Sequence, residues 1–257
     1  MNIFVFDIET IPDVESGRRI HGLEGLSDAD VAKAMFHLRR QEAGTEFLRL
    51  HMQKVVAISA VLRSRDRVTV WSLGEEDSEE KELIQRFFDG IDKFVPTLVS
   101  WNGSGFDLPV LHYRALLHGV AAPRYWDSGD DDRDFKWNNY LSRYHSRHTD
   151  LMDVLAGYQA RANAPLDEIA TMLGFPGKMG MSGAHVWDNY QEGDLAGIRN
   201  YCETDVLNTY LVWLRFQLMR GRLSGAEYAA ECTLLRETLA AEDKPHLNEF
   251  LAAWPAD

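Results

Sequence analysis

Two carboxylates near the start of the chain stand at a spacing that would let them do chemistry together. Asp7 directly follows the apolar run NIFVF at residues 2–6, and Glu9 comes two positions later. Side chains of a β-strand alternate between its two faces, so residues i and i+2 project from the same face. Both carboxylates could therefore point at one spot and hold a hard divalent cation. The alternative is a strand end that carries two solvated acids.

Two further acids gain interest from their surroundings. Asp107 opens a predicted helix after a glycine-containing loop at residues 103–105, where the helix dipole alone would favour an acid. Asp205 lies among apolar residues of another predicted helix, where a carboxylate is costly unless it is paired or bound to a metal. Tyr201 precedes Asp205 by four residues, so both side chains lie on one helix face. The other interpretation of Tyr201 is a core aromatic with a satisfied hydroxyl.

The elements that must position these residues follow from hydrophobic periodicity. Strands are predicted at 2–6, which should end on Asp7, and at 54–62, 67–72 and 97–102. Helices are predicted at 27–51, 78–94, 107–118, 150–160, 165–173, 194–220 and, as the last one, after Ser224. The polar turn RSRD indicates a hairpin between the second and third strands, and residues 120–147 are predicted to be irregular. This order favours a mixed sheet with helices on both faces, in a single domain over residues 1–257.

The composition excludes several classes of protein. Forty acidic residues against 27 basic ones give a net charge of −13, which counts against a protein that binds nucleic acid by neutralising its backbone. An enzyme that meets phosphates through bound metal ions remains compatible, since its carboxylates make the count more acidic.

The sequence also bears on location. No apolar run reaches the roughly 18 residues of a membrane-spanning helix, and the N-terminus lacks the basic region of a signal peptide. The two cysteines, Cys202 and Cys232, give no disulfide framework and fit a reducing compartment. A cytoplasmic protein without membrane contact is therefore expected.

Three motifs together form a known pattern. They are FDIET at residues 6–10, WNGSGFD at 101–107 and YCETD at 201–205. In order, spacing and element type this set resembles the DEDD superfamily of 3′–5′ exonucleases, in the subclass with tyrosine in the third motif. It is most similar to the bacterial group related to the proofreading exonuclease domain of family B DNA polymerases.

The resemblance implies a ribonuclease H-like α/β fold and a set of functional residues. The implied ligands of two divalent cations, Mg²⁺ or Mn²⁺, are Asp7, Glu9, Asp107 and Asp205. Tyr201 would orient the attacking water, which completes the five implied catalytic residues. The implied substrate contacts are Thr10, Asn102 and Phe106. Two segments have no assigned role: a helical insertion at about 12–52 and a helical C-terminal extension at about 222–257.

The expected function is hydrolysis of phosphodiester bonds at the 3′ end of a nucleic acid, with single-stranded DNA as the expected substrate and nucleoside 5′-monophosphates as products. Two cations about 3.5–4 Å apart suit this chemistry, because they activate the water and stabilise the leaving oxygen. Two alternatives stay open: a catalytically weak nucleic-acid-binding or partner-binding module with the same fold, and an exoribonuclease. The presence of all four acids and Tyr201 favours an enzyme. A partner in replication or DNA repair is not identified by the sequence. No polymerase domain fits in this length, so a stand-alone enzyme is expected.

Overall fold

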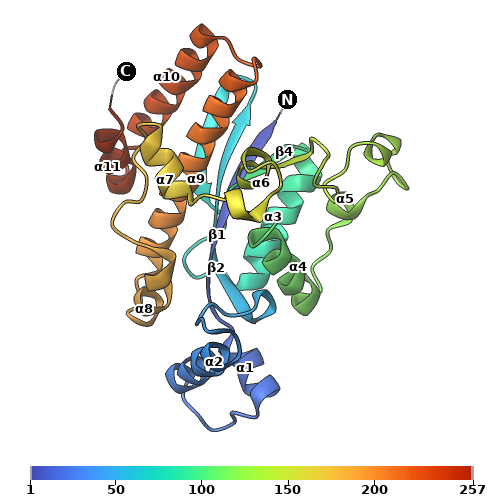
Figure 1. Cartoon of the computed structure of the whole chain (residues 1–257), viewed down its shortest axis with the longest axis vertical. Coiled ribbons are helices and arrows are strands. Elements are labelled where there is room, and N and C mark those ends of the chain that lie inside the picture. The colour runs from blue at the N-terminus through green and yellow to red at the C-terminus, as the bar shows by residue number, and fades with distance from the viewer. Residues whose placement is uncertain (1, 256–257) are drawn as a thin grey trace.

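A five-stranded mixed sheet forms the centre of the computed structural model, which describes residues 2–255 (Figure 1). The strands are β1 (Ile3–Pro12), β2 (Gln53–Ser64), β3 (Arg67–Ser72), β4 (Thr97–Ser100) and β5 (His148–Asp150). Their order in the sheet is β3-β2-β1-β4-β5. β1, β2 and β3 pair antiparallel, whereas β4 runs parallel to β1 and to β5. Antiparallel neighbours are joined by short connections, and the parallel pairs require the helical crossovers that the chain supplies.

Helices cover both faces of this sheet. They are α1 (Val14–His21), α2 (Asp28–Ala43), α3 (Glu80–Phe94), α4 (Asp107–His118), α5 (Pro123–Trp126), α6 (Leu151–Leu155), α7 (Leu166–Met172), α8 (Val186–Gln191), α9 (Leu195–Met219), α10 (Gly225–Glu242) and α11 (Pro245–Ala253). In Figure 1, α3 and α4 lie on one side of the sheet, and α9 lies on the other with α7 and α10. The predicted ribonuclease H-like α/β fold is confirmed. Across residues 2–255, no helix combines the length and apolar character needed to cross a membrane.

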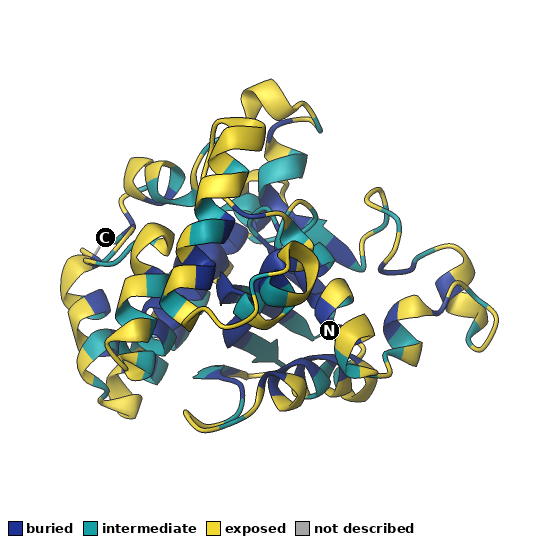
Figure 2. Cartoon of the chain, turned by 90° about the horizontal axis from the view of Figure 1, so that it is seen from below, coloured by how far each residue is buried: buried dark blue, intermediate teal, exposed yellow. Residues whose placement is uncertain are grey.

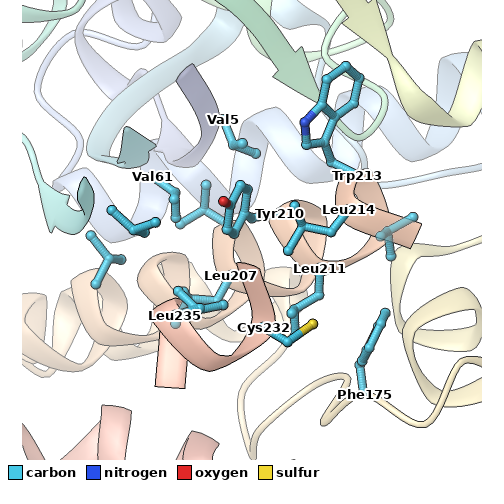
Figure 3. Close-up of a cluster of buried hydrophobic side chains, with 14 of the residues drawn as sticks. Val5, Val61, Phe175, Leu207, Tyr210, Leu211, Trp213, Leu214, Cys232 and Leu235 are labelled. Carbon is cyan, nitrogen blue, oxygen red and sulfur yellow. The ribbon is translucent and has the colours of Figure 1, made fainter. Parts of the chain in front are cut away.

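The alternation of side chains along β1 divides the core into two layers. Phe4, Phe6 and Ile8 pack into a cluster formed mainly with α3 and α4. Val5 faces the other way and packs into the cluster built on α9, where Figure 3 shows it beside Tyr210. Figure 2 shows buried residues gathered around the sheet and exposed residues on the outer helices. The odd-numbered residues of β1 therefore face α9.

Three predicted boundaries are wrong. The helix predicted over 150–160 is α6, which ends at Leu155. β1 does not end on Asp7 but continues to Pro12, because β2 pairs with it over that whole length. The helix predicted over 27–51 ends at Ala43, because Gly44 adopts a left-handed conformation (φ +71°) that closes the last turn. As a result Phe47 lies outside the helix. The predicted helix starts at Ser27 and Ser224 are confirmed, since each serine accepts a hydrogen bond from the backbone three residues on.

Five elements were not predicted as such. Two are short helices: α5, in the stretch predicted to be irregular, and α8, before the helix predicted over 194–220. β5 has three residues, too few for a periodic pattern, and it lies between the stretch predicted to be irregular and the helix predicted from residue 150. α1 precedes the predicted helix of the insertion, and α11 follows what was predicted to be the last helix. Pro245 occupies the first turn of α11, where its missing N–H costs nothing.

A buried ion-pair network fixes the start of the insertion to the body of the protein. Arg114 of α4 is 3% exposed and donates from Nε to Glu80 Oε1 at 2.7 Å. The same guanidinium also donates to Asp13, which is the N-cap of α1. Both carboxylates are buried against Arg114, and Glu80 also contacts His118 Nε2 at 2.7 Å.

Replacing Arg114 with Met should lower the free energy of unfolding by about 3–5 kcal/mol, because two buried carboxylates lose the guanidinium that faces them. Arg86→Met is the matched control, since Arg86 forms an exposed pair with Glu82 on α3. That control should cost less than about 1 kcal/mol. Chemical denaturation of both variants checks this. Equal, small losses would show that the Arg114 network does not hold the insertion.

Candidate active site

β1 and α9 bring four of the predicted site residues together. Asp7 and Glu9 continue the face that begins at Val5, so both carboxylates point toward α9, and Glu9 is 7% exposed. Tyr201 and Asp205 lie one helical turn apart on α9. The carboxylate of Asp205 lies close enough to those of Asp7 and Glu9 that its charge raises the pKa of both.

Asp107 joins the cluster because β4 is short. β4 pairs with β1 only as far as Val5, so the next part of that edge of β1 has no strand beside it. The backbone N–H of Ile8 instead donates to Asp107 Oδ1 at 3.2 Å. Asp107 is the first residue of α4 and is 3% exposed. A free backbone donor on β1 therefore anchors the carboxylate that the sequence placed at this helix start.

Asp150, which the sequence analysis left out of the site, shapes the loop before Asp107. Its Oδ1 accepts from the backbone N of Asn102 at 2.9 Å, and its Oδ2 accepts from that of Ser104 at 2.8 Å. Asn102 has a φ of +64°, and a Cβ at Gly103 would lie 2.2 Å from a serine oxygen of β4. Asp150 ends β5, which is too short to be predicted, so the sequence offered no strand end that would single this acid out. The contacts of Asn102 serve this loop, and its contact with substrate stays a prediction.

Cys202 is a second neighbour that the sequence analysis missed. Its thiol points at Asp7, with Sγ at 3.5 Å from the backbone oxygen and 3.7 Å from Oδ2. Asp7, Glu9 and Cys202 place ligand atoms within 4.8 Å of one another. Burial raises the pKa of the thiol, so it stays protonated and is a poor metal ligand. The strong donors of the cluster are carboxylate oxygens.

The cluster carries more negative charge than its surroundings balance. Burial raises the pKa of Asp7 well above its usual value, and the charges of Asp107, Glu9 and Asp205 raise it further. Burial likewise raises the pKa of Glu9, again with help from Asp205 and Asp107. The pKa of Asp107 rises to about 7 and that of Asp205 to about 6, both mainly because of burial. Carboxylates that repel one another in this way fit a site for hard divalent cations.

Tyr201 is held as a neutral hydrogen-bond donor. It is 5% exposed, and its hydroxyl donates to the carboxylate of Asp205, which lowers the pKa of that acid against the effect of burial. Burial raises the pKa of Tyr201, and the charges of Asp205 and Glu9 add to the rise. The phenol therefore keeps its proton beside the carboxylates.

Lys178 supplies a positive charge from a glycine-rich loop. The loop is tied to α9 by Asn208, which accepts from Gly177 N at 3.1 Å and donates to Gly177 O at 2.9 Å. The backbone N of Lys178 donates to Asp167 of α7 at 2.7 Å. The side chain is exposed, yet its charge lowers the pKa of both Glu9 and Asp205. The loop thus holds a lysine in front of the carboxylates.

A cleft of about 880 Å³ opens in front of the cluster. Its lining includes the predicted site residues Glu9, Thr10 and Phe106, together with Lys178. Aromatic side chains from the insertion and from α8 complete its walls. Of the four clustered acids Glu9 lines the cleft, and Glu46 and Asp188 lie at its walls. Aromatic walls suit a ligand with flat, apolar groups, and Lys178 beside Glu9 suits the phosphate of such a ligand.

Divalent cations should stabilise the protein more strongly as the pH rises. Asp107 and Asp205 have pKa values of about 7 and about 6, raised from 3.8, so the folded metal-free protein binds more protons than the unfolded chain between about pH 4 and pH 7. The two acids therefore destabilise the metal-free fold progressively across that window and fully above it. Cation binding needs the deprotonated carboxylates.

Melting curves with and without Mn²⁺, at matched ionic strength, check this expectation. The metal-free melting temperature should fall, and the increment due to Mn²⁺ should grow, between about pH 5 and pH 8. A free Mn²⁺ concentration 100-fold above its dissociation constant should raise the free energy of unfolding by roughly 2.7 kcal/mol. An increment that is independent of pH would contradict a cation site made of these acids.

Comparison with known families gives one match. Residues 45–254 match the family described as predicted 3′–5′ exonucleases related to the exonuclease domain of PolB. The matched region contains Asp107, Tyr201 and Asp205. Asp7 and Glu9 precede it, on β1, which pairs with β2 inside the matched region. No curated protein matches the chain.

Proposed function

The chain belongs to the family of predicted 3′–5′ exonucleases related to the exonuclease domain of PolB, and from that premise we propose that its carboxylate cluster hydrolyses nucleic acid from the 3′ end. The proposed enzyme is of the tyrosine-containing DEDD type and releases nucleoside 5′-monophosphates. Residues 1–257 would form one catalytic domain, with a helical insertion at about 12–52 and a helical extension at about 222–257.

The observation that carries the proposal is the convergence of four carboxylates whose pKa values are all raised. In the proposal, Asp7, Glu9, Asp107 and Asp205 hold two divalent cations, Mg²⁺ or Mn²⁺. Such cations, when bound, lower the pKa of a coordinated water and stabilise the charge on the leaving oxygen. The carboxylates fix where that chemistry happens, because β1, α4 and α9 present them from three directions.

The remaining polar groups of the site would act on the water and the phosphate. Tyr201 donates to Asp205 and keeps its proton, so its hydroxyl can orient a water beside that carboxylate. Lys178 faces the cluster from the opposite loop and would balance the charge of a phosphate placed there. With cations and Lys178 in place, a protein of net charge −13 can accept an anionic strand.

The substrate is proposed to be the 3′ end of a single strand, with DNA preferred. Thr10 and Phe106 line the cleft beside Glu9, where they can contact the terminal nucleotide. Phe106 offers an aromatic surface, which suits an unpaired base.

Digestion of a 5′-labelled DNA oligonucleotide with Mg²⁺ or Mn²⁺ tests the proposal. Products should shorten one nucleotide at a time, the released species should be 5′-monophosphates, and a 3′-phosphate should block the reaction. A matched RNA oligonucleotide measures the preference of the enzyme for DNA over RNA. Nicking of a circular single strand would point to an endonuclease, and binding without cleavage would favour a non-catalytic module.

A further inference from the structure

Phe47, in the helical insertion, is an exposed aromatic side chain that lines the cleft. Phe47 is 57% exposed, yet its ring centroid lies 5.7 Å from that of Phe106, across an interplanar angle of 49°. Both residues line the cleft in front of the carboxylates. Phe106 directly precedes Asp107, so Phe47 extends the aromatic wall outward from the cluster and leaves most of its own surface open.

Hydrogen bonds fix the backbone around Phe47 although most of its side chain is exposed. Arg39 of α2 donates from Nε to the Phe47 carbonyl at 2.9 Å. Gln53 donates to the Leu48 carbonyl at 3.3 Å and accepts from the Thr10 hydroxyl at 3.0 Å. Thr10 directly follows the second carboxylate of β1. A chain of hydrogen bonds therefore ties the exposed ring to the strand that carries the site.

The cleft is also lined by a second aromatic side chain and by a positive charge. Trp187 of α8 and Lys178 line it opposite the insertion. Glu46, the acid beside Phe47 in this lining, is paired with Arg40. Single strands are bound where a positive charge meets the backbone and aromatic rings stack on the bases, because every base has a flat face. The cleft offers both in one groove that leads to the carboxylates.

We propose that Phe47 stacks on the unpaired base next to the 3′-terminal nucleotide, and that the insertion thereby makes the cleft selective for single-stranded 3′ ends. This inference rests on the proposed function, since it places the terminal phosphodiester at the carboxylate cluster. A strand in that position lays its last base along Phe106 and the preceding base along Phe47. A base within a duplex is already stacked and paired, so it presents no free face to the ring.

Binding of a fluorescent oligothymidylate in EDTA tests the contact without catalysis. Phe47→Ala and Phe47→Leu should weaken binding about 5- to 150-fold, whereas Phe47→Tyr should restore it, because only an aromatic ring stacks on a base. Ile20→Ala is the matched control: Ile20 belongs to the same insertion and is 58% exposed, but it lines a different hollow. The control should bind as the wild type does.

A substrate series identifies the base. An abasic site next to the terminal nucleotide should weaken wild-type binding as much as Phe47→Ala does, and the two changes together should cost little more than either alone. An abasic site several nucleotides further in should act independently of Phe47. With Mn²⁺, Phe47→Ala should raise KM on oligonucleotides and reduce the preference for single strands over duplexes. Its hydrolysis of p-nitrophenyl thymidine 5′-phosphate, which has one base, should match the wild type.

The outcomes separate this inference from the proposed function. A wild-type protein that binds oligothymidylate through Phe47 but cleaves nothing would overturn the exonuclease and leave the stacking contact standing. A wild-type protein that digests 3′ ends, with Phe47→Ala unchanged in affinity, KM and strand preference, would overturn the role of Phe47 alone. Additive effects of Phe47→Ala and the abasic site would likewise overturn it.

Discussion

Asp205→Asn is expected to lower kcat by about 10³-fold or more, because a cation loses an anionic ligand and the water loses the carboxylate beside Tyr201. The same change should raise the melting temperature of the metal-free protein. Burial raises the pKa of Asp205 to about 6, so the neutral amide is easier to bury than the carboxylate at neutral pH. One variant should therefore be more stable and much less active. Asp7→Asn should behave in the same way, since the pKa of Asp7 is raised well above its usual value.

Glu203→Gln on the same helix is the control. Glu203 is also buried, but its carboxylate accepts from Ser72 and is paired with His246, at 2.9 Å and 2.7 Å. These partners hold the pKa of Glu203 below its usual value against the effect of burial. Its loss should lower the melting temperature and leave kcat nearly unchanged. Steady-state kinetics and metal-free melting curves measure both quantities. If Asp205→Asn kept near-full activity with Mg²⁺, the assignment of the cluster would be wrong.

Tyr201→Phe should lower kcat by about 10²–10⁴-fold with little change in KM, because groups that position a reactant and assist proton transfer contribute on that scale. The hydroxyl donates to Asp205 and stays protonated, which is what orientation of a water requires. Removing it keeps the ring, so packing on α9 should persist. Single-turnover kinetics with saturating enzyme separates the chemical event from substrate binding.

Tyr210→Phe provides the comparison for Tyr201. Tyr210 is also a buried tyrosine of α9, and its hydroxyl donates to Glu231 of α10 at 3.2 Å. Its loss should reduce stability by about 1 kcal/mol, the usual contribution of one hydrogen bond, and leave kcat unchanged. If Tyr201→Phe instead raised KM and kept kcat, the hydroxyl would be a substrate contact.

The sequence was enough to predict which side chains of β1 and of α9 share a face, because that depends only on the geometry of neighbouring backbone residues. The alternation of β1 placed Asp7 and Glu9 on one face, and the helical period of α9 placed Tyr201 and Asp205 one turn apart. These relations need no knowledge of distant residues. The same reasoning predicted the serine caps of α2 and α10, since a cap is satisfied within three residues.

Where the prediction went wrong, a local signal was outweighed or too short to detect. Phe47 and Leu50 continued a helical spacing, but Gly44 ended α2 before them. β1 was predicted to end on Asp7 because the apolar run of residues 2–6 stops there, yet pairing with β2 continues it to Pro12. β5 has only three residues, and its existence depends on the parallel pairing with β4.

The sequence by itself determined the fold class, the order of the longer elements and the positions of the four acids and Tyr201 on them. Only the tertiary structure decided which other groups surround them. Asp107 meets the Ile8 backbone across 99 residues of sequence, and Asp150 meets Asn102 across 48. Lys178 and Phe47 reach the cleft on loops without periodicity, held by Asn208 and Arg39. Strand and helix periods are properties of neighbouring residues, whereas these contacts arise from chain segments that meet only after the sheet and α9 have packed together.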